Sequence, residues 1–192
     1  MMPRDWIQRA TRFRYTLPVL ALLHQHSGAK FISLVRILSA SDRAIRQALD
    51  YLIELDWVER NPGYGHPSRP EYILTLDGSR VAPTAASVWS ELAAWSNEEI
   101  AMERWPLVAL DSVLGGNHRF AQISKDIRAT PRAVALALQR LDSAGLVERK
   151  IIHAYPPTTL YEPTQWGAAL LSPSGELRSP GDLSPLDSRD KA

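Results

Sequence analysis

The chain of 192 residues contains no cysteine. This absence excludes disulfides, thiolate metal ligands, cysteine nucleophiles and thiol-based redox sensing, and it fits a reducing cytoplasm. The sequence also lacks an apolar run long enough to span a bilayer and an N-terminal apolar core of signal-peptide length. We therefore expect a cytoplasmic protein that makes no membrane contact.

An excess of charge of one sign is missing as well, because the formal net charge is only +1. Nucleic-acid-binding proteins are usually more basic, at least on one face. The total charge is thus mild evidence against strong DNA binding, although local patches matter more than the sum.

Catalytic and metal-binding motifs are the third absence. The sequence contains no phosphate loop, no paired carboxylates and no Ser-His-Asp order, and Gly115-Gly116 is typical of a helix end. His24 and His26 are two residues apart, so on a helix they point to different sides and make a poor metal pair. The sequence predicts a protein that is not an enzyme and holds no metal or cofactor.

The most informative stretch that is present is residues 41–52. Ile45, Leu49 and Leu52 recur at spacings of four and three, which places them on one face of a helix. Ser41 is suited to be the N-cap, because its hydroxyl can accept from a free N–H of the first turn. The other face carries Arg43, Arg46, Gln47 and Asp50.

The surrounding pattern is that of a winged helix-turn-helix. Three helices are expected before the helix at 41–52, at residues 3–13, 16–26 and 30–38. Thr16 is expected to be the N-cap of the second. Two strands, at 57–60 and 71–75, flank a loop rich in Gly and Pro and form a hairpin. A long helix then runs from about 79 to 95 with an apolar arc wide enough for two partners. Ser96 and Glu99 form a capping-box pattern that starts the next helix.

The first unit then repeats. Val147-Glu148-Arg149 copies Val58-Glu59-Arg60, and Phe120, Tyr161, Thr164 and Gly167 fall where Phe31, Tyr72, Thr75 and Gly78 fell. From Phe31 onward the register holds without a gap, which indicates an internal duplication. The predicted fold is mainly α with short β-hairpins: two tandem winged helix-turn-helix units, 1–78 and 104–171, joined by connecting helices at 79–103, of which the first is long and central. Residues 172–192, rich in Pro, Ser and charge, are predicted to be a disordered tail.

Each unit resembles the winged helix-turn-helix of HxlR-type transcriptional regulators, relatives of the MarR group. The matching segments together cover roughly residues 14–171: 14–23, 30–34, 43–52, 57–60 and 70–78 in the first unit, and 104–114, 119–123, 132–141 and 145–149 in the second. The resemblance implies a DNA-binding regulator that is normally a homodimer with one unit per chain. Here two units are fused, so an internal pseudo-dimer can replace the family dimer, alone or within a further homodimer. The N-terminal cysteine of redox-sensing members is absent.

The two helices at the recognition position differ in chemistry. Arg43, Arg46 and Gln47 suit base edges in the major groove, where Arg pairs with guanine and Gln with adenine. Ser41 suits a phosphate at the helix N-terminus, and Arg60, His66 and Arg69 suit the phosphates or the minor groove beside the wing. In the second unit Ala135-Leu136 replace Arg46-Gln47 and cannot hydrogen-bond a base. Arg132, Gln139 and Arg140 flank these positions, so we expect the second helix to contact phosphates only or to have lost base reading.

Four tryptophans, Trp6, Trp89, Trp95 and Trp105, lie in or beside the segments that join the units. Core packing is the plainer interpretation, and the functional one is an aromatic pocket for a flat apolar effector. The sequence therefore favours a regulator that binds duplex DNA, with a small aromatic molecule as the effector to test. The alternative is a winged-helix scaffold repurposed to bind or transform a small aromatic molecule, with DNA binding lost.

Overall fold

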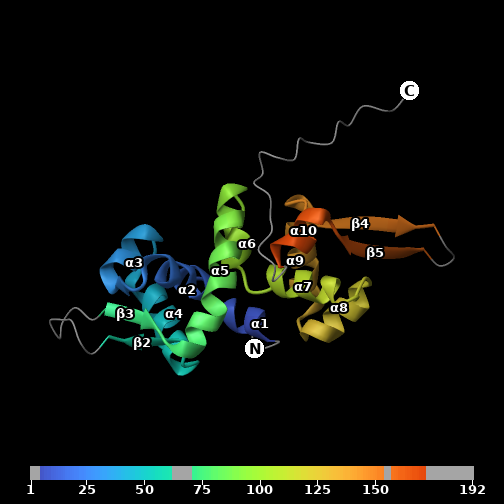
Figure 1. The fold of residues 1–192 in the computed structure, drawn as a ribbon. Helices are drawn as coiled ribbons and strands as arrows, with labels where there is room; N and C mark the ends of the chain where they lie inside the picture. The colour runs from blue at the N-terminus through green and yellow to red at the C-terminus, as the bar shows by residue number, and fades with distance from the viewer. Residues whose placement is uncertain (1–4, 62–70, 154–156, 172–192) are drawn as a thin grey trace.

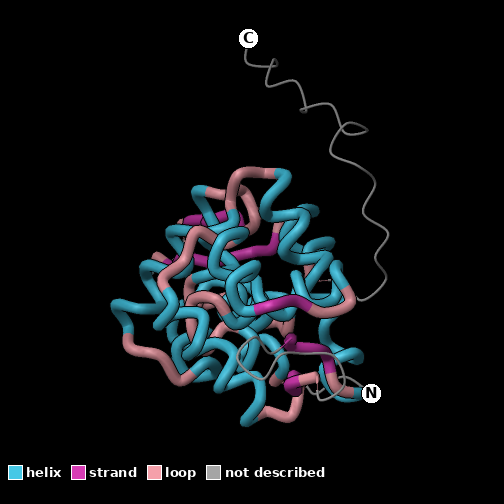
Figure 2. The backbone as a smooth tube through the Cα atoms, turned by 90° about the vertical axis from the view of Figure 1, so that its left-hand side faces the viewer, coloured by secondary structure: helices cyan, strands magenta, loops and turns pink. Residues whose placement is uncertain are grey.

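The computed structural model describes residues 5–61, 71–153 and 157–171. In these ranges the chain is mainly helical with small antiparallel sheets, which confirms the predicted fold class at that level. The first half runs α1 (Trp6–Ala10), α2 (Thr16–His26), β1 (Ala29–Lys30), α3 (Phe31–Ile37), α4 (Asp42–Glu54), β2 (Val58–Arg60), β3 (Glu71–Leu74) and α5 (Leu76–Ala94). The second half runs α6 (Glu98–Met102), α7 (Pro106–Leu114), α8 (Phe120–Ile127), α9 (Pro131–Ser143), β4 (Val147–Ile152), β5 (Thr158–Pro163) and α10 (Gln165–Leu170). Seen from the side, the strands are short stretches in a largely helical body (Figure 2).

Helix α4 has the polarity that its sequence predicts. Ile45, Leu49 and Leu52 are buried on one face, and the charged side chains lie exposed on the other. Ser41 is the N-cap, since its hydroxyl accepts a 3.3 Å hydrogen bond from the N–H of Ala44. The cap fixes where α4 begins, and the buried stripe fixes which face points outward.

The first sheet contains a strand that the sequence pattern does not reveal. β3 pairs with β2, as predicted for a hairpin, and also with β1, so the order is β1-β3-β2. β1 is only two residues long, with Ala29 opposite Tyr72. A segment this short carries no period, so only pairing with a distant strand identifies it.

Helix α5 stands between the two halves of the molecule (Figure 1). It packs against α2 and α6 and also contacts α10. Val81, Ala85, Val88 and Leu92 are buried along one stripe, and Ala82 and Ala86 beside it are buried too. The wide apolar arc therefore does meet more than one partner, as its width predicts. The helix starts three residues earlier than expected, because the hydroxyl of Thr75 accepts from the N–H of Gly78 and caps it.

Three predictions about helix ends are wrong. Thr16 is the first residue of α2 and not its cap, and its buried hydroxyl has no hydrogen-bond partner among the described residues. Ser96 lies in the left-handed region (φ 54°), where its N–H closes α5, and Asn97 precedes α6 instead. Helix α1 ends at Ala10, and the hydroxyl of Thr11 donates to the carbonyls of Ile7 and Arg104. The hydrogen bond to Arg104 connects the turn after α1 to the second half of the chain.

The same local contacts occur in both halves. Thr164, 89 residues after Thr75, likewise accepts a hydrogen bond from the N–H of the third residue of the following helix, here Gly167. The Thr75 hydroxyl donates to the carbonyl of Asp56, and the Thr164 hydroxyl to that of Gly145. The β2–β3 and β4–β5 hairpins point away from each other at opposite ends of the molecule (Figure 1).

The buried apolar side chains of both halves form one cluster. Helix α1 contributes to the join by touching both α2 and α7, and α6 touches both α2 and α7. The candidate surfaces described next therefore lie on halves that pack against each other. None of the helices in the described part of the chain is long and apolar enough to cross a membrane.

Candidate nucleic-acid interface

The outer face of α4 gathers the side chains predicted to read bases. Arg43, Arg46 and Gln47 are exposed, as is Asp50 one turn further on. The guanidinium carbon of Arg46 lies 4.6 Å from the centre of the Phe31 ring on α3. Stacking on a ring restricts the guanidinium plane while its N–H groups stay free to donate. Arg46 is thus presented outward and partly oriented.

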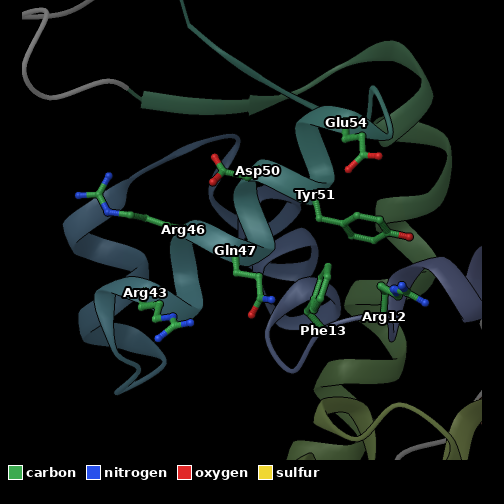
Figure 3. A pocket seen from close by; sticks show the side chains of 8 residues that line it. All are labelled: Arg12, Phe13, Arg43, Arg46, Gln47, Asp50, Tyr51 and Glu54. Atoms are coloured by element: carbon green, nitrogen blue, oxygen red, sulfur yellow. The ribbon is translucent and has the colours of Figure 1, made fainter.

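A hollow lies beside this face of α4 (Figure 3), lined by Arg12, Phe13, Arg43, Arg46, Gln47, Asp50, Tyr51 and Glu54. The rings of Phe13 and Tyr51 meet edge to face, with centroids 5.1 Å apart, so the segment after α1 is packed against α4. Burial raises the pKa of Tyr51, and Arg12 and Arg9 act against that rise. The phenol is therefore neutral at neutral pH and can donate a hydrogen bond. The hollow holds both signs of charge, since Asp50 and Glu54 face the same space.

Helix α9 begins with the same kind of cap as α4 but presents a different face. The Thr130 hydroxyl accepts from the N–H of Ala133 at 3.3 Å. Ala135 and Leu136 are both exposed, the latter to 53 %. An exposed Leu cannot hydrogen-bond a base edge, so the positions that match Arg46 and Gln47 of α4 are apolar.

The remaining polar residues of α9 have unequal surroundings. Arg132 and Gln139 are exposed. Arg140 faces the acidic helix α6, with its Nε 3.2 Å from a carboxylate oxygen of Glu103 and its Nη2 3.9 Å from one of Glu99. These carboxylates compete with any phosphate for Arg140. Their positions could not be read from the sequence because α6 and α9 are about forty residues apart.

The two hairpins also differ. Arg60 is exposed on β2, whereas His66 and Arg69 lie outside the described residues. On β4, Lys150 lies 2.7 Å from a Glu162 oxygen and 3.4 Å from a Glu148 oxygen, and Ile151 and Ile152 are exposed. Arg149 of β4 occupies the position of Arg60 and is exposed as well, so the hairpins differ in the residues that follow it, the ion-paired Lys150 and the exposed Ile151 and Ile152.

The four tryptophans have separate surroundings. Trp6 belongs to the buried core and is 6 % exposed. Trp89 is half-buried and packs against that core. Trp95 meets Trp166 edge to face, with centroids 5.4 Å apart. Trp105 lines a hollow between the two halves, beneath the guanidinium of Arg104 at 4.4 Å. A shared aromatic pocket stays a prediction, and Trp105 is the member that borders an open space.

The sequence pattern does not single out the arginines of this second hollow. Arg9, Arg12, Arg104 and Arg128 all line it. They come from α1 and its following turn, from the segment before α7 and from the residue after α8. The one signal in the sequence is the density of arginine near the start of the first unit, where Arg9, Arg12 and Arg14 fall within six residues.

Comparison with known families adds one finding. Residues 100–178 match the model of the HxlR-like helix-turn-helix family. The match begins in α6 and includes α7 to α10, and residues 1–99 lie outside it. It falls on the half in which helix α9 carries Ala135-Leu136. Searches of curated proteins and of solved structures found no match. The part of the chain that the structure describes contains no cluster of three His, Asp or Glu that could hold a metal ion.

Proposed function

We propose that this protein is a DNA-binding transcriptional regulator in which α4 reads the base sequence. The observation that carries the proposal is the exposed trio Arg43, Arg46 and Gln47 on a capped helix whose opposite face is buried. The helix-turn-helix match at residues 100–178 supports a DNA-binding regulator in general. Arg and Gln on the first turns of a recognition helix are the side chains that reach base edges in the major groove.

The proposed architecture is a tandem pair of winged helix-turn-helix units that acts as an internal pseudo-dimer on duplex DNA. Its support is the recurrence, 89 residues apart, of the Thr75 and Thr164 caps together with the order of helices and strands around them. The hairpins at opposite ends of the molecule have the placement of two wings (Figure 1). One chain then supplies both units that a dimeric regulator needs.

The pair is functionally unequal in this proposal. Helix α9 contributes phosphate contacts through Arg132 and Gln139, and no base reading. The Glu99 and Glu103 carboxylates beside Arg140 support this division, because a phosphate would have to displace them.

The test compares matched positions of the two helices. Arg46→Ala is expected to weaken binding to a duplex selected from a randomised library by about 5- to 100-fold, the range for losing one bidentate base contact. Leu136→Ala is expected to leave that affinity within about twofold, because an exposed Leu makes no such bond. Fluorescence anisotropy on the selected duplex and on a scrambled one measures both effects.

The outcomes separate the alternatives. Equal losses for Arg46→Ala and Leu136→Ala would refute the unequal pair. An absence of duplex binding even at low salt would refute the regulator and favour the scaffold that binds a small aromatic molecule, for which Trp105 is the first residue to test.

A further inference from the structure

The hollow between the two halves, here called the seam hollow, is continuous with the α4 face. Arg12 and Tyr51 line both the hollow beside α4 and the seam hollow. Figure 3 shows the two side chains next to each other at the edge of the α4 site. The seam hollow extends from there over Arg9 of α1 to Arg104 and Arg128 of the second half.

Three of its arginines have no carboxylate partner in the part of the chain that the structure describes. Within the described residues, no ion pair joins Arg12, Arg104 or Arg128 to a carboxylate. The two acids that line the hollow contact residues other than these three arginines. Asp5 pairs with Arg9 at 2.8 Å, and Asp126 accepts a 2.6 Å hydrogen bond from the Ser112 hydroxyl. The lining contains Arg9, Arg12, Arg104 and Arg128 against Asp5 and Asp126, so positive charge is in excess there.

Two of these guanidinium groups lie over the aromatic ring of the next residue. Arg104 lies 4.4 Å from the Trp105 ring centre, and Arg12 lies 5.8 Å from that of Phe13. A stacked guanidinium loses less conformational entropy when it binds an anion. Its fork of N–H donors matches a phosphate, to which two parallel hydrogen bonds can form.

The matching positions of the second half carry two carboxylates and one arginine. Counted back from the equivalent Arg14 and Arg104, Glu99 and Glu103 stand where the first half has Arg9 and Phe13. Arg140 stands where α4 has Tyr51, and the two carboxylates hold it. Charge repulsion thus disfavours a polyanion at the second location and favours it at the first.

We propose that the seam hollow binds backbone phosphates of the DNA duplex whose bases α4 reads. The inference rests on the proposed DNA-binding function and adds the path of the DNA. The duplex lies across the first unit and the seam, with Arg12, Arg104 and Arg128 as phosphate ligands. It is not placed symmetrically over α4 and α9.

The experiment replaces all three ligands together, as Arg12→Gln, Arg104→Gln and Arg128→Asn. Asn is chosen at 128 because that residue lies in the left-handed region (φ 53°), which Asn tolerates. The affinity for the selected duplex and for a scrambled duplex is measured against KCl concentration. Each lost phosphate contact is expected to reduce the slope of log K against log salt by about 0.9, so the triple variant should lose about two to three units on both duplexes.

Three controls sharpen the result. Arg80→Gln removes an arginine that is ion-paired with Asp77 on α5, and it is expected to leave the slope unchanged. Arg9→Gln should reduce the slope less than Arg12→Gln, because Asp5 already neutralises Arg9. Arg12→Lys with Arg104→Lys keeps the charges and should keep most of the slope. Circular dichroism melting verifies that each variant is folded.

An unchanged salt slope in the folded triple variant would overturn the inference, and so would a loss confined to the selected duplex. If inorganic pyrophosphate stabilises the wild type but not the triple variant, while DNA binding is unchanged, the hollow takes a small anion and the inference is wrong. If Arg46→Ala abolishes the preference for the selected duplex while the triple variant binds as the wild type does, the inference about the seam hollow is wrong and the proposed function stands. If the wild type binds no duplex at low salt, both the proposed function and the inference about the seam hollow are wrong.

Discussion

Gly78 and Gly167 show how a single residue fixes the contact between a helix and the residue just before the hairpin that leads into it. A Cβ added to Gly78 would come within 1.9 Å of the Trp57 carbonyl oxygen, and one added to Gly167 within 2.0 Å of the Leu146 oxygen. Both obstacles are backbone atoms, which cannot rotate away as a flexible side chain can. Each helix therefore approaches the preceding segment as closely as it does only because the side chain is a hydrogen.

Gly78→Ala and Gly167→Ala are each expected to lower the free energy of unfolding by at least about 2 kcal/mol, since the overlap forces a backbone shift. Urea denaturation followed by far-UV circular dichroism measures this. Gly115→Ala is the matched control, because its nearest atoms lie at an ordinary 3.4 Å. A loss at Gly115 as large as at Gly78 would contradict the steric explanation.

At the scale of the element, α4 and α9 have the same scaffold and different outer faces. Both are 13 residues long, both have a hydroxyl N-cap, and both bury Ile or Val, Ala, Leu and Leu at matching positions. What differs is the exposed surface, where Arg46-Gln47 face solvent in one and Ala135-Leu136 in the other. Stability of the helix and contact with a ligand therefore depend on separate residues, and one can change without the other.

Removing the N-cap hydroxyl of α4 or of α9 should lower the free energy of unfolding by a similar amount. Ser41→Ala and Thr130→Ala each remove the acceptor of one first-turn N–H, which typically lowers stability by about 1 kcal/mol. Chemical denaturation is the measurement, and Ser143→Ala at the exposed end of α9 is the control with an expected effect near zero. A cap effect at Ser41 but none at Thr130 would show that α9 does not depend on its N-cap.

At the scale of the whole molecule, the two halves share one core. Leu92 of α5 is fully buried, and α5 packs on α2 of the first half and contacts α10 of the second. The hydrogen bond from the Thr11 hydroxyl to the Arg104 carbonyl, 3.0 Å long, joins the halves on another side. Neither half can expose this interface to water without losing apolar burial.

We therefore expect a single cooperative unfolding transition in calorimetry, with a calorimetric enthalpy equal to the van't Hoff enthalpy. Leu92→Ala should lower the stability by about 2–5 kcal/mol, the usual cost of such a cavity. In native-state hydrogen exchange the amides of α4 and α9 should then lose protection together. Loss of protection in α4 alone would mean that the halves unfold independently.

The sequence by itself determined the elements whose signals are local. The spacing of Ile45, Leu49 and Leu52 predicted α4 and its buried face, and the hydroxyl of Ser41 predicted where it begins. The mainly helical class and the hairpin of β2 and β3 followed from the same kind of pattern. These features depend on residues within a few positions of one another, so periodicity and capping suffice to find them.

The tertiary structure alone decided which charges are free. Arg140 looks available in the sequence but is paired with Glu99 and Glu103, whereas Arg12 and Arg104 meet at the seam although 92 residues separate them. Whether an arginine can bind a phosphate depends on the carboxylates and rings around it, and these come from distant segments. The sequence determines which carboxylates and rings lie beside an arginine only through the complete tertiary structure.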